Sequence, residues 1–341
     1  MRTASAPPAQ RDRVRLLVAA PDRLQHAAFA DLGWYVAPGD LVVVNTSGTL
    51  PAAVDGERGD GSAVTVHFST ALDHGDWVVE VRPRRAATGP VPDLRHGERI
   101  MLPDGVRLTV GTPHPAGQRR LWRVRVPVDG GVPAYLARAG RPIRYGYLRV
   151  RPPIAAYQTV FARDPGSAEM PSAGRPFTDA AVTDLITRGV VVAPVLLHTG
   201  VSSQDAGEPP QPERFVVGEP TARLVNLTRA RGGRVVAVGT TVTRALESAA
   251  GADAVVRPTS GWTDLVLGAE HPARVVSGLI TGWHAPGASH LHLLEAVAGA
   301  DLVDAAYAEA ERTGYRWHEF GDSCLLLPGR SVADEGQQRV V

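Results

Sequence analysis

Three short polar stretches each follow a run of apolar residues, and their side chains could move protons or bind an anion. His198 follows "VVVAPVLL", the Gly-Thr-Thr of residues 239–241 follows "VVAV", and the Thr-Gly-Trp-His of residues 281–284 follows "GLI". Imidazole accepts and returns protons near neutral pH, and the N–H groups at a helix start bind carboxylates and phosphates. Ligands of open α/β sheets bind outside the carboxyl ends of strands. We therefore expect these stretches to share one crevice.

The Gly-Thr-Thr turn also has a purely structural explanation. Thr240 or Thr241 can cap the helix that begins there, and Arg244 and Glu247 can form an exposed pair on that helix. The turn lacks the glycine spacing of phosphate-loop and dinucleotide-binding motifs. Residues 239–241 therefore predict either a helix cap or a ligand cradle, and a lone histidine is more often structural than catalytic.

Two further segments carry residues that could act in a site. Tyr157 and Gln158 open a long Gly/Pro/Ser-rich loop and could stack on or hydrogen-bond to a base, while Glu169 in the same loop could act as an acid or base. Loops over strand ends often bind ligands, although an ordinary linker fits this loop equally well. Asp322 stands after a glycine before the apolar "CLLLP", where a turn-forming aspartate is the alternative to a catalytic one.

Composition narrows the class of protein. The 36 Lys+Arg and 35 Asp+Glu residues give a formal charge of +1, which does not indicate a protein that coats nucleic acid. The single cysteine, Cys324, excludes an internal disulfide and a cysteine-based zinc site, and we expect it to be buried and inert. No metal-binding motif is present, so we expect no metal cofactor.

The chain also lacks targeting and membrane signals. Its first residues, "MRTASAPPAQRDRVRLL", have no continuous apolar segment of the kind found in signal peptides. No apolar run approaches the roughly 18 residues of a membrane span. We therefore expect a cytoplasmic protein with no membrane partner.

Two textures divide the chain into regions. Residues 61–149 hold short alternating segments such as "AVTVHFST" and "DWVVEVRP", with turn residues between them and no segment of helical period. This pattern is typical of a β-barrel or sandwich. Strands precede this region, and helices alternate with strands after residue 150. We predict a discontinuous α/β domain from residues 1–60 and 150–330, with an inserted all-β barrel domain from residues 61–149.

The predicted α/β domain has a mainly parallel sheet. Its first clear helix should begin at an N-cap, Thr178, and end at Gly189. Residues 1–12 are polar and Pro-rich and predict a loose arm, and residues 331–341 predict a disordered tail. The strands of the sheet are expected at "RVRLLVAA", "GDLVVVN", "VVVAPVLLH", "RVVAVG", "RVVSGLI" and "CLLLP".

Taken in order, many stretches resemble one family, the S-adenosylmethionine:tRNA ribosyltransferase-isomerases of queuosine biosynthesis. The resemblance implies an α/β domain with an inserted β-barrel. It also implies transfer and isomerisation of the ribosyl part of S-adenosylmethionine, the co-substrate, onto 7-aminomethyl-7-deazaguanine in the tRNA anticodon, with release of adenine and methionine. The matching stretches are "PGDLVVVNTSGTLPA", "YQTVFA", "PSAGRPFT", "LLHTG", "RVVAVGTTVTRALESA", "WTDLVL", "GLITGWHAPGASHLHLLEAVAG" and "YRWHEFGD".

The resemblance also suggests roles within the site. Such chemistry needs a base next to the sulfonium, an acid for the departing adenine, and donors that hold the substrate. By resemblance, proton transfer falls to His198 and His284, with Asp322 as a partner, and co-substrate binding falls to Gly239, Thr240, Thr241 and Arg244. Glu169 is a further catalytic candidate by its own chemistry. Tyr157, Gln158, Thr281 and Trp283 are further candidates for binding the co-substrate.

The chain departs from the family pattern in five stretches, one of which is "HVGLGTF", which here reads "HTGVSSQ" (residues 198–204). "PLPPYI" reads "RPIRYGYL" (residues 141–148), and "GSVAAPTAGLHFT" reads "GSAEMPSAGRPFT" (residues 166–178). "TNFHLPKSTLLML" reads "TGWHAPGASHLHL" (residues 281–293), and only Glu213 remains of an HxMHxE block. These changes leave two alternatives to the tRNA reaction. One is a paralogue that cleaves or cyclises S-adenosylmethionine or modifies a small-molecule acceptor, and the other is a non-catalytic binder of an adenosine-containing ligand.

Overall fold

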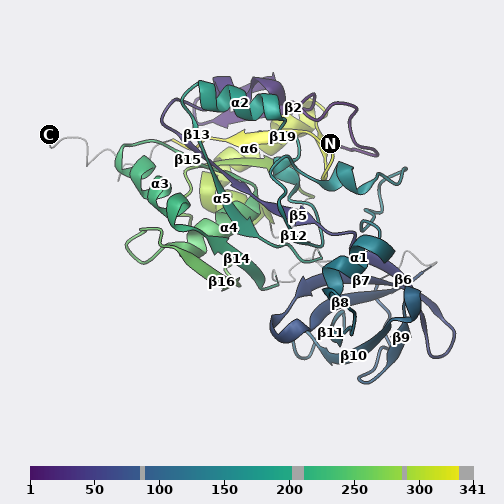
Figure 1. Ribbon diagram of the computed structural model, residues 1–341. Helices are drawn as coiled ribbons and strands as arrows, with labels where there is room; N and C mark the ends of the chain where they lie inside the picture. The colour runs from purple at the N-terminus through teal and green to yellow at the C-terminus, as the bar shows by residue number, and fades with distance from the viewer. Residues whose placement is uncertain (85–88, 202–210, 286–289, 330–341) are drawn as a thin grey trace.

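The computed structural model describes residues 1–84, 89–201, 211–285 and 290–329, and the predicted tail at 331–341 lies outside them. The chain forms a larger body that contains helices on both sides of a sheet and a smaller body built around a barrel (Figure 1). None of the helices in these ranges has the length and apolar character needed to span a bilayer.

The larger body is built on a sheet with the strand order β16-β14-β13-β4-β15-β17-β19-β2-β3. Its central strands β13, β4, β15 and β17 run parallel to one another, and the β19–β2 pair is also parallel. The pairs β16–β14, β14–β13, β17–β19 and β2–β3 are antiparallel. The carboxyl ends of the central strands therefore meet at one edge. The strands are β2 Arg15–Ala20, β3 Arg23–Ala28, β4 Leu41–Asn45, β13 Val191–Leu197, β14 Glu213–Val217, β15 Val235–Val238, β16 Thr259–Thr263, β17 Gly278–Gly282 and β19 Ser323–Leu326.

Alternating strand residues bury opposite faces of this sheet. In β4, Leu41 and Val43 pack with helices α3 to α6, whereas Val42 and Val44 pack with η1 and α2. This two-sided burial explains why the central strands are almost wholly apolar. The predicted α/β fold with a barrel is thus confirmed. The covering elements are η1 Phe29–Trp34, α2 Asp179–Thr187, α3 Glu219–Ala230, α4 Thr240–Ala249, α5 His290–Ala298 and α6 Ala300–Arg312.

The smaller body is a closed antiparallel barrel with the order β10-β11-β8-β7-β6-β9. Its first strand starts at Ala53, before the predicted boundary at residue 61. The expectation that no helix interrupts this region is wrong, because α1 packs Val132, Tyr135 and Leu136 into the barrel core. The elements are β6 Ala53–Arg58, β7 Ala63–Ala71, η2 Asp73–Gly75, β8 Trp77–Pro83, β9 Arg99–Met101, η3 Pro103–Gly105, β10 Arg107–Pro113, β11 Leu121–Arg125 and α1 Gly131–Ala139.

Short pairings tie the connecting segments down. The prediction of a loose arm at residues 1–12 is wrong at its start, because β1 pairs with β18 and Ala4 is buried. The N–H groups of Arg2 and Ala4 bond to carbonyls near the C-terminus, so the arm completes a small sheet. The remaining elements are β1 Arg2–Thr3, β5 Ser47–Thr49, η4 Ile154–Tyr157, β12 Asp164–Ser167, η5 Ser172–Gly174 and β18 Arg316–Trp317.

The two helix starts predicted from threonines have different outcomes. Thr178 caps α2 by accepting the Ala181 N–H at 3.2 Å, and Gly189 follows the helix at φ 86°, as predicted. At α4 the N-cap is Gly239, with no side-chain cap, so the threonine-cap explanation is wrong. The exposed Arg244–Glu247 pair is also wrong, because both side chains are buried with other partners.

Candidate active site

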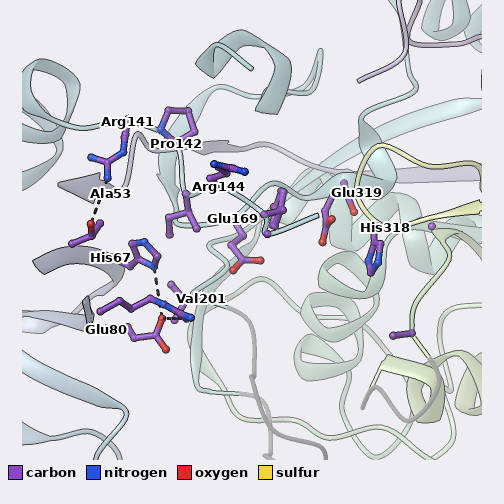
Figure 2. Close-up of a pocket in the computed structure, with 18 of the residues that line it drawn as sticks. Ala53, His67, Glu80, Arg141, Pro142, Arg144, Glu169, Val201, His318 and Glu319 are labelled. Carbon is purple, nitrogen blue, oxygen red and sulfur yellow. Dashed lines mark hydrogen bonds and ion pairs between the residues drawn. The ribbon is translucent and has the colours of Figure 1, made fainter. Parts of the chain in front are cut away.

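A cavity of about 820 Å³ lies between the barrel and the α/β body. Figure 2 shows His67 and Glu80 on the barrel side, His318 and Glu319 on the opposite side, and Glu169 between them in this view. The cavity therefore brings barrel strands, the 141–148 linker and loops of the α/β body to one space.

The barrel wall is built around a buried carboxylate, Glu80. Its oxygens lie 3.2 Å from Arg82 Nη1, 3.3 Å from Arg120 Nη1 and 3.7 Å from His67 Nδ1. Burial alone raises the pKa of this carboxyl, but the hydrogen bond from His67 and the two arginine charges outweigh it and hold the pKa below its ordinary value. Glu80 is therefore ionised at neutral pH and holds two cations at the wall.

Further arginines extend this wall toward the linker. Arg141 Nη2 donates to Asp55 at 2.6 Å, and Arg84 Nη2 lies 3.3 Å from the same carboxylate. Arg144 donates to the Leu148 carbonyl at 3.0 Å, and its side chain also lines the cavity. About half of the Arg84 and Arg141 side chains is exposed, at 54% and 44%. This wall can therefore offer guanidinium groups to an anion in the cavity.

The opposite wall carries Glu319. The Tyr147 hydroxyl donates a hydrogen bond to the Glu319 carboxylate. The His318 ring stacks on the Tyr147 ring, with centroids 4.4 Å apart and planes 11° apart. Burial raises the pKa of Glu319 to about 7. This carboxyl can therefore both accept and return a proton near neutral pH.

Next to this wall, His284 lies on the loop that follows β17. Its Nε2 is 3.3 Å from the Thr281 hydroxyl, and its backbone N–H donates to the Tyr307 hydroxyl at 3.1 Å. Burial, together with the neighbouring His290 and His318, lowers the pKa of His284 to about 3. His284 is therefore neutral at physiological pH.

Three of the residues proposed from the sequence line the cavity: Glu169, Trp283 and His284. Trp283 is 2% exposed, and its ring packs edge-on against Tyr307 and Tyr315. Its Nε1 is buried without a hydrogen-bond partner among the described residues. Thr281 is not among the lining residues, but its hydroxyl contacts His284, which is.

His198 lies outside the cavity lining, in a polar network at the carboxyl edge of the sheet. Its Nδ1 is 2.7 Å from the Ser47 hydroxyl, which is 2.6 Å from the Ser167 hydroxyl. Gly166 lies so close that a Cβ there would be 2.3 Å from His198 Cε1. Burial lowers the pKa of this imidazole, so His198 is a neutral member of a hydrogen-bonded layer.

The Gly-Thr-Thr turn joins the same edge through Asn45. The Asn45 amide donates to the Leu197 carbonyl at 2.8 Å and to the Thr241 hydroxyl at 3.2 Å. Gly239 has φ 91° and bonds to the Ile280 carbonyl, and Thr240 is the first residue of α4. The predicted strand ends therefore do converge, but residues 239–241 do not reach the cavity lining.

Two other proposed residues, Arg244 and Asp322, have structural partners. Arg244 pairs with Glu213 and donates to the carbonyls of Leu265 and Thr263, which occupies all of its guanidinium nitrogens. Asp322 accepts the N–H groups of Arg15 and Arg316 at 2.9 and 2.8 Å. Neither Arg244 nor Asp322 is among the residues that line the cavity.

The start of the 157–178 loop is likewise packed. Tyr157 is 2% exposed and lies in an aromatic cluster with Tyr145 and Phe320. The Gln158 amide accepts the Thr49 N–H at 2.9 Å and donates to the Thr49 carbonyl at 2.8 Å. Both residues hold this loop against β5 and line no part of the cavity.

Four of the stretches that depart from the family pattern meet in the cavity, and the 198–204 stretch contributes Val201. Residues 141–146 form the linker wall, Glu169 and Ser172 come from the 166–178 stretch, and residues 282–285 with His290 come from the 281–293 stretch. Arg175, from the 166–178 stretch, is instead buried over the Phe320 ring at 4.9 Å. Two features of the sequence could have revealed these wall residues. Tyr147 lies in the departing stretch 141–148, and His318 and Glu319 are adjacent titratable residues in "WHEFGD".

Known proteins resemble this chain over almost its full length. The family described as "Queuosine biosynthesis protein" matches residues 1–326. The S-adenosylmethionine:tRNA ribosyltransferase-isomerase of Moorella thermoacetica is 37% identical over 336 residues, which cover 95% of this chain and 96% of the relative. The enzyme of the same name from Symbiobacterium thermophilum is 36% identical over 337 residues, with the same coverage.

A solved structure shows the same similarity. The crystal structure of S-adenosylmethionine tRNA ribosyltransferase from Thermotoga maritima matches with a TM-score of 0.52 and 27% identity, covering 95% of this chain and 96% of that chain. The family match over residues 1–326 spans the sheet, the barrel and the residues that line the cavity. The chain therefore belongs to the S-adenosylmethionine:tRNA ribosyltransferase-isomerase family.

Proposed function

We propose that this chain transfers and isomerises the ribosyl part of S-adenosylmethionine onto 7-aminomethyl-7-deazaguanine in a tRNA anticodon. The observation that carries this proposal is the full-length match to enzymes named for that reaction. Adenine and methionine would leave, and the modified tRNA would remain. We further propose that the reaction takes place in the cytoplasm. We also propose that it uses no metal, because the sulfonium itself activates the neighbouring carbon.

The two walls of the cavity support this assignment. The arginines of the barrel and linker wall suit the phosphates of a polynucleotide, since guanidinium groups bind phosphate oxygens in a bidentate manner. Glu169 and Glu319 suit the positive charge of the sulfonium, because a carboxylate is stabilised by a nearby cation. We propose that the co-substrate lies toward His284 and Glu319 and the tRNA toward the barrel.

We also keep the division into a discontinuous α/β domain and an inserted barrel domain as a proposal. The barrel has its own apolar core, separate from the two cores that sandwich the large sheet. Expression of residues 53–139 alone tests it, with a cooperative thermal transition as the expected result.

Release of adenine tests the function directly. Purified protein is incubated with S-adenosylmethionine and tRNA that carries the deazaguanine base, and adenine and modified tRNA are measured by mass spectrometry. We expect both products in equal amounts. Adenine formed equally well without tRNA would favour cleavage of the co-substrate or a small-molecule acceptor. Tight binding of S-adenosylmethionine without any product would favour a non-catalytic binder of an adenosine-containing ligand.

A further inference from the structure

The turn that carries Glu319 is rigidly built. Asp322 accepts the N–H groups of Arg15 and Arg316, and the Gly321 N–H donates to the His318 carbonyl at 2.9 Å. A Cβ at Gly321 would lie 2.3 Å from the Arg316 carbonyl oxygen, so the chain can fold back here only with glycine. The turn between β18 and β19 thus holds Glu319 at the cavity wall.

A distant segment fixes the carboxylate itself. Tyr147, from the linker, donates its hydroxyl proton to the Glu319 carboxylate. Tyr147 is held between two rings, because Tyr145 stacks on it at 5.7 Å with planes 6° apart and His318 stacks at 4.4 Å. The two ring stacks therefore fix the hydroxyl, which hydrogen-bonds to Glu319 from a segment that departs from the family pattern.

Glu80 and the cavity histidines are less suited to proton exchange. Glu80 is held ionised by three cationic or hydrogen-bonding neighbours. His284 has a pKa near 3, and burial also lowers the pKa of His290 and His318. A base with so low a pKa binds a proton weakly at pH 7, whereas Glu319 titrates close to that pH.

We propose that Glu319 is the base that takes the proton from the carbon attached to the sulfonium of S-adenosylmethionine. A carboxylate oxygen forms the new O–H bond as the C–H bond breaks, and the electron pair stays on the carbon beside the positive sulfur. Tyr147 is the positioning residue that orients this carboxylate. The inference rests on the proposed function.

The charged and titratable groups around Glu319 determine how it responds to pH. Tyr145 and Tyr147 face it from the linker, His318 from its own turn, and Glu169 from the neighbouring loop. Tyr145 and His318 are neutral near pH 7, because burial raises the pKa of Tyr145 and lowers the pKa of His318. A bound sulfonium would favour the ionised carboxylate, which is the form a base requires.

The test is single-turnover release of adenine by wild type, Glu319→Gln and the exposed-carboxylate control Glu311→Gln, whose side chain is 77% exposed on α6. We expect Glu319→Gln to lower the rate by about 100-fold or more, the usual range for loss of a general base. Its affinity for S-adenosylmethionine, measured by calorimetry, should fall far less than the rate, because Glu319 supplies only part of the negative charge that faces the sulfonium, and Glu311→Gln should match wild type. A Glu319→Gln rate within about threefold of wild type would overturn the inference.

The pH profile separates a base from a structural residue. Wild-type rate should rise with pH through a limb near 7, and Glu319→Gln should lose this limb. Tyr147→Phe should move the limb to higher pH, because the lost hydroxyl stabilises the ionised carboxylate. An unchanged limb in Glu319→Gln would refute the assignment. If Glu319→Gln does not fold, the pH profile is measured on Glu319→Asp, which keeps a carboxylate and should keep the limb. Loss of the limb in Glu319→Asp would contradict the role of Glu319 as the base.

Failure of the proposed function gives a different result. Wild type would then release no adenine with the modified-base tRNA, whatever stands at position 319. Turnover by wild type with no effect of Glu319→Gln would instead leave the function standing and refute the role of Glu319 alone.

Discussion

The imidazole rings of His284 and His290 lie face to face, with their planes 4° apart and their centroids 4.6 Å apart. Protonation of either ring is unfavourable, because the positive charge would lie next to the other imidazole and away from bulk water. The contact places both histidines in the cavity as neutral groups.

The first prediction concerns stability and pH. His284 has an ordinary unfolded pKa near 6.5 and a folded pKa of about 3. The unfolded chain therefore binds the extra proton between these values, and stability falls as pH decreases from 6.5 toward 3, by at most about 1.4 kcal/mol per pH unit for this group. Denaturant unfolding at pH 7 and 5 should show a smaller loss for His284→Gln than for wild type. The same relief in His292→Gln, an exposed ring, would contradict it.

The second prediction concerns the buried Glu213–Arg244 pair. Arg244→Met leaves the Glu213 carboxylate buried without its cation and should cost about 3–5 kcal/mol of unfolding free energy. Adding Glu213→Gln should recover part of this loss, because no buried charge remains. The exposed Arg257–Asp253 pair is the control, and Arg257→Met should leave the urea midpoint nearly unchanged. A normal midpoint in Arg244→Met would show that the pair is not structural.

The third prediction concerns the contact between Gly166 and His198. A Cβ at residue 166 would lie 2.3 Å from Cε1 and 2.4 Å from Nδ1 of the ring. Gly166→Ala should therefore displace the ring from Ser47 and cost about 1–3 kcal/mol. Gly59→Ala, where a Cβ meets nothing within 4 Å, should be close to neutral. Equal thermal midpoints for the two variants would exclude a tight contact.

The fourth prediction concerns the arginine wall and follows from the proposed tRNA substrate. If Arg141 contacts a phosphate, Arg141→Ala should weaken tRNA binding and flatten the plot of log affinity against log salt by about one unit. Binding of S-adenosylmethionine should not change. Arg257→Ala, far along the chain on an exposed pair, should leave the slope as it is. Fluorescence anisotropy with labelled tRNA measures both, and equal slopes for Arg141→Ala and wild type would rule out the contact.

The sequence by itself determined the fold class and the family. The continuous apolar run of residues 41–44 indicates a strand buried between two layers, and the alternating apolar and polar residues of 63–68 indicate a barrel or sandwich strand, so local periodicity separated the sheet from the barrel. The Thr178 cap and the inert, buried Cys324 follow from local chemistry in the same way. The helix α1 was not predicted: Val132, Tyr135 and Leu136 have helical spacing, but glycines and a proline at its start resemble the turn residues of the surrounding region.

Only the tertiary structure decided which polar residues face the cavity. Arg244 was predicted to bind the co-substrate and Asp322 to assist proton transfer, yet other groups occupy both: Glu213 for the first, and the N–H groups of Arg15 and Arg316 for the second. Tyr147 and Glu319 are 172 residues apart, and no local pattern relates them. Burial and hydrogen bonding depend on what packs against a side chain, and these contacts come from segments that the chain brings together only on folding.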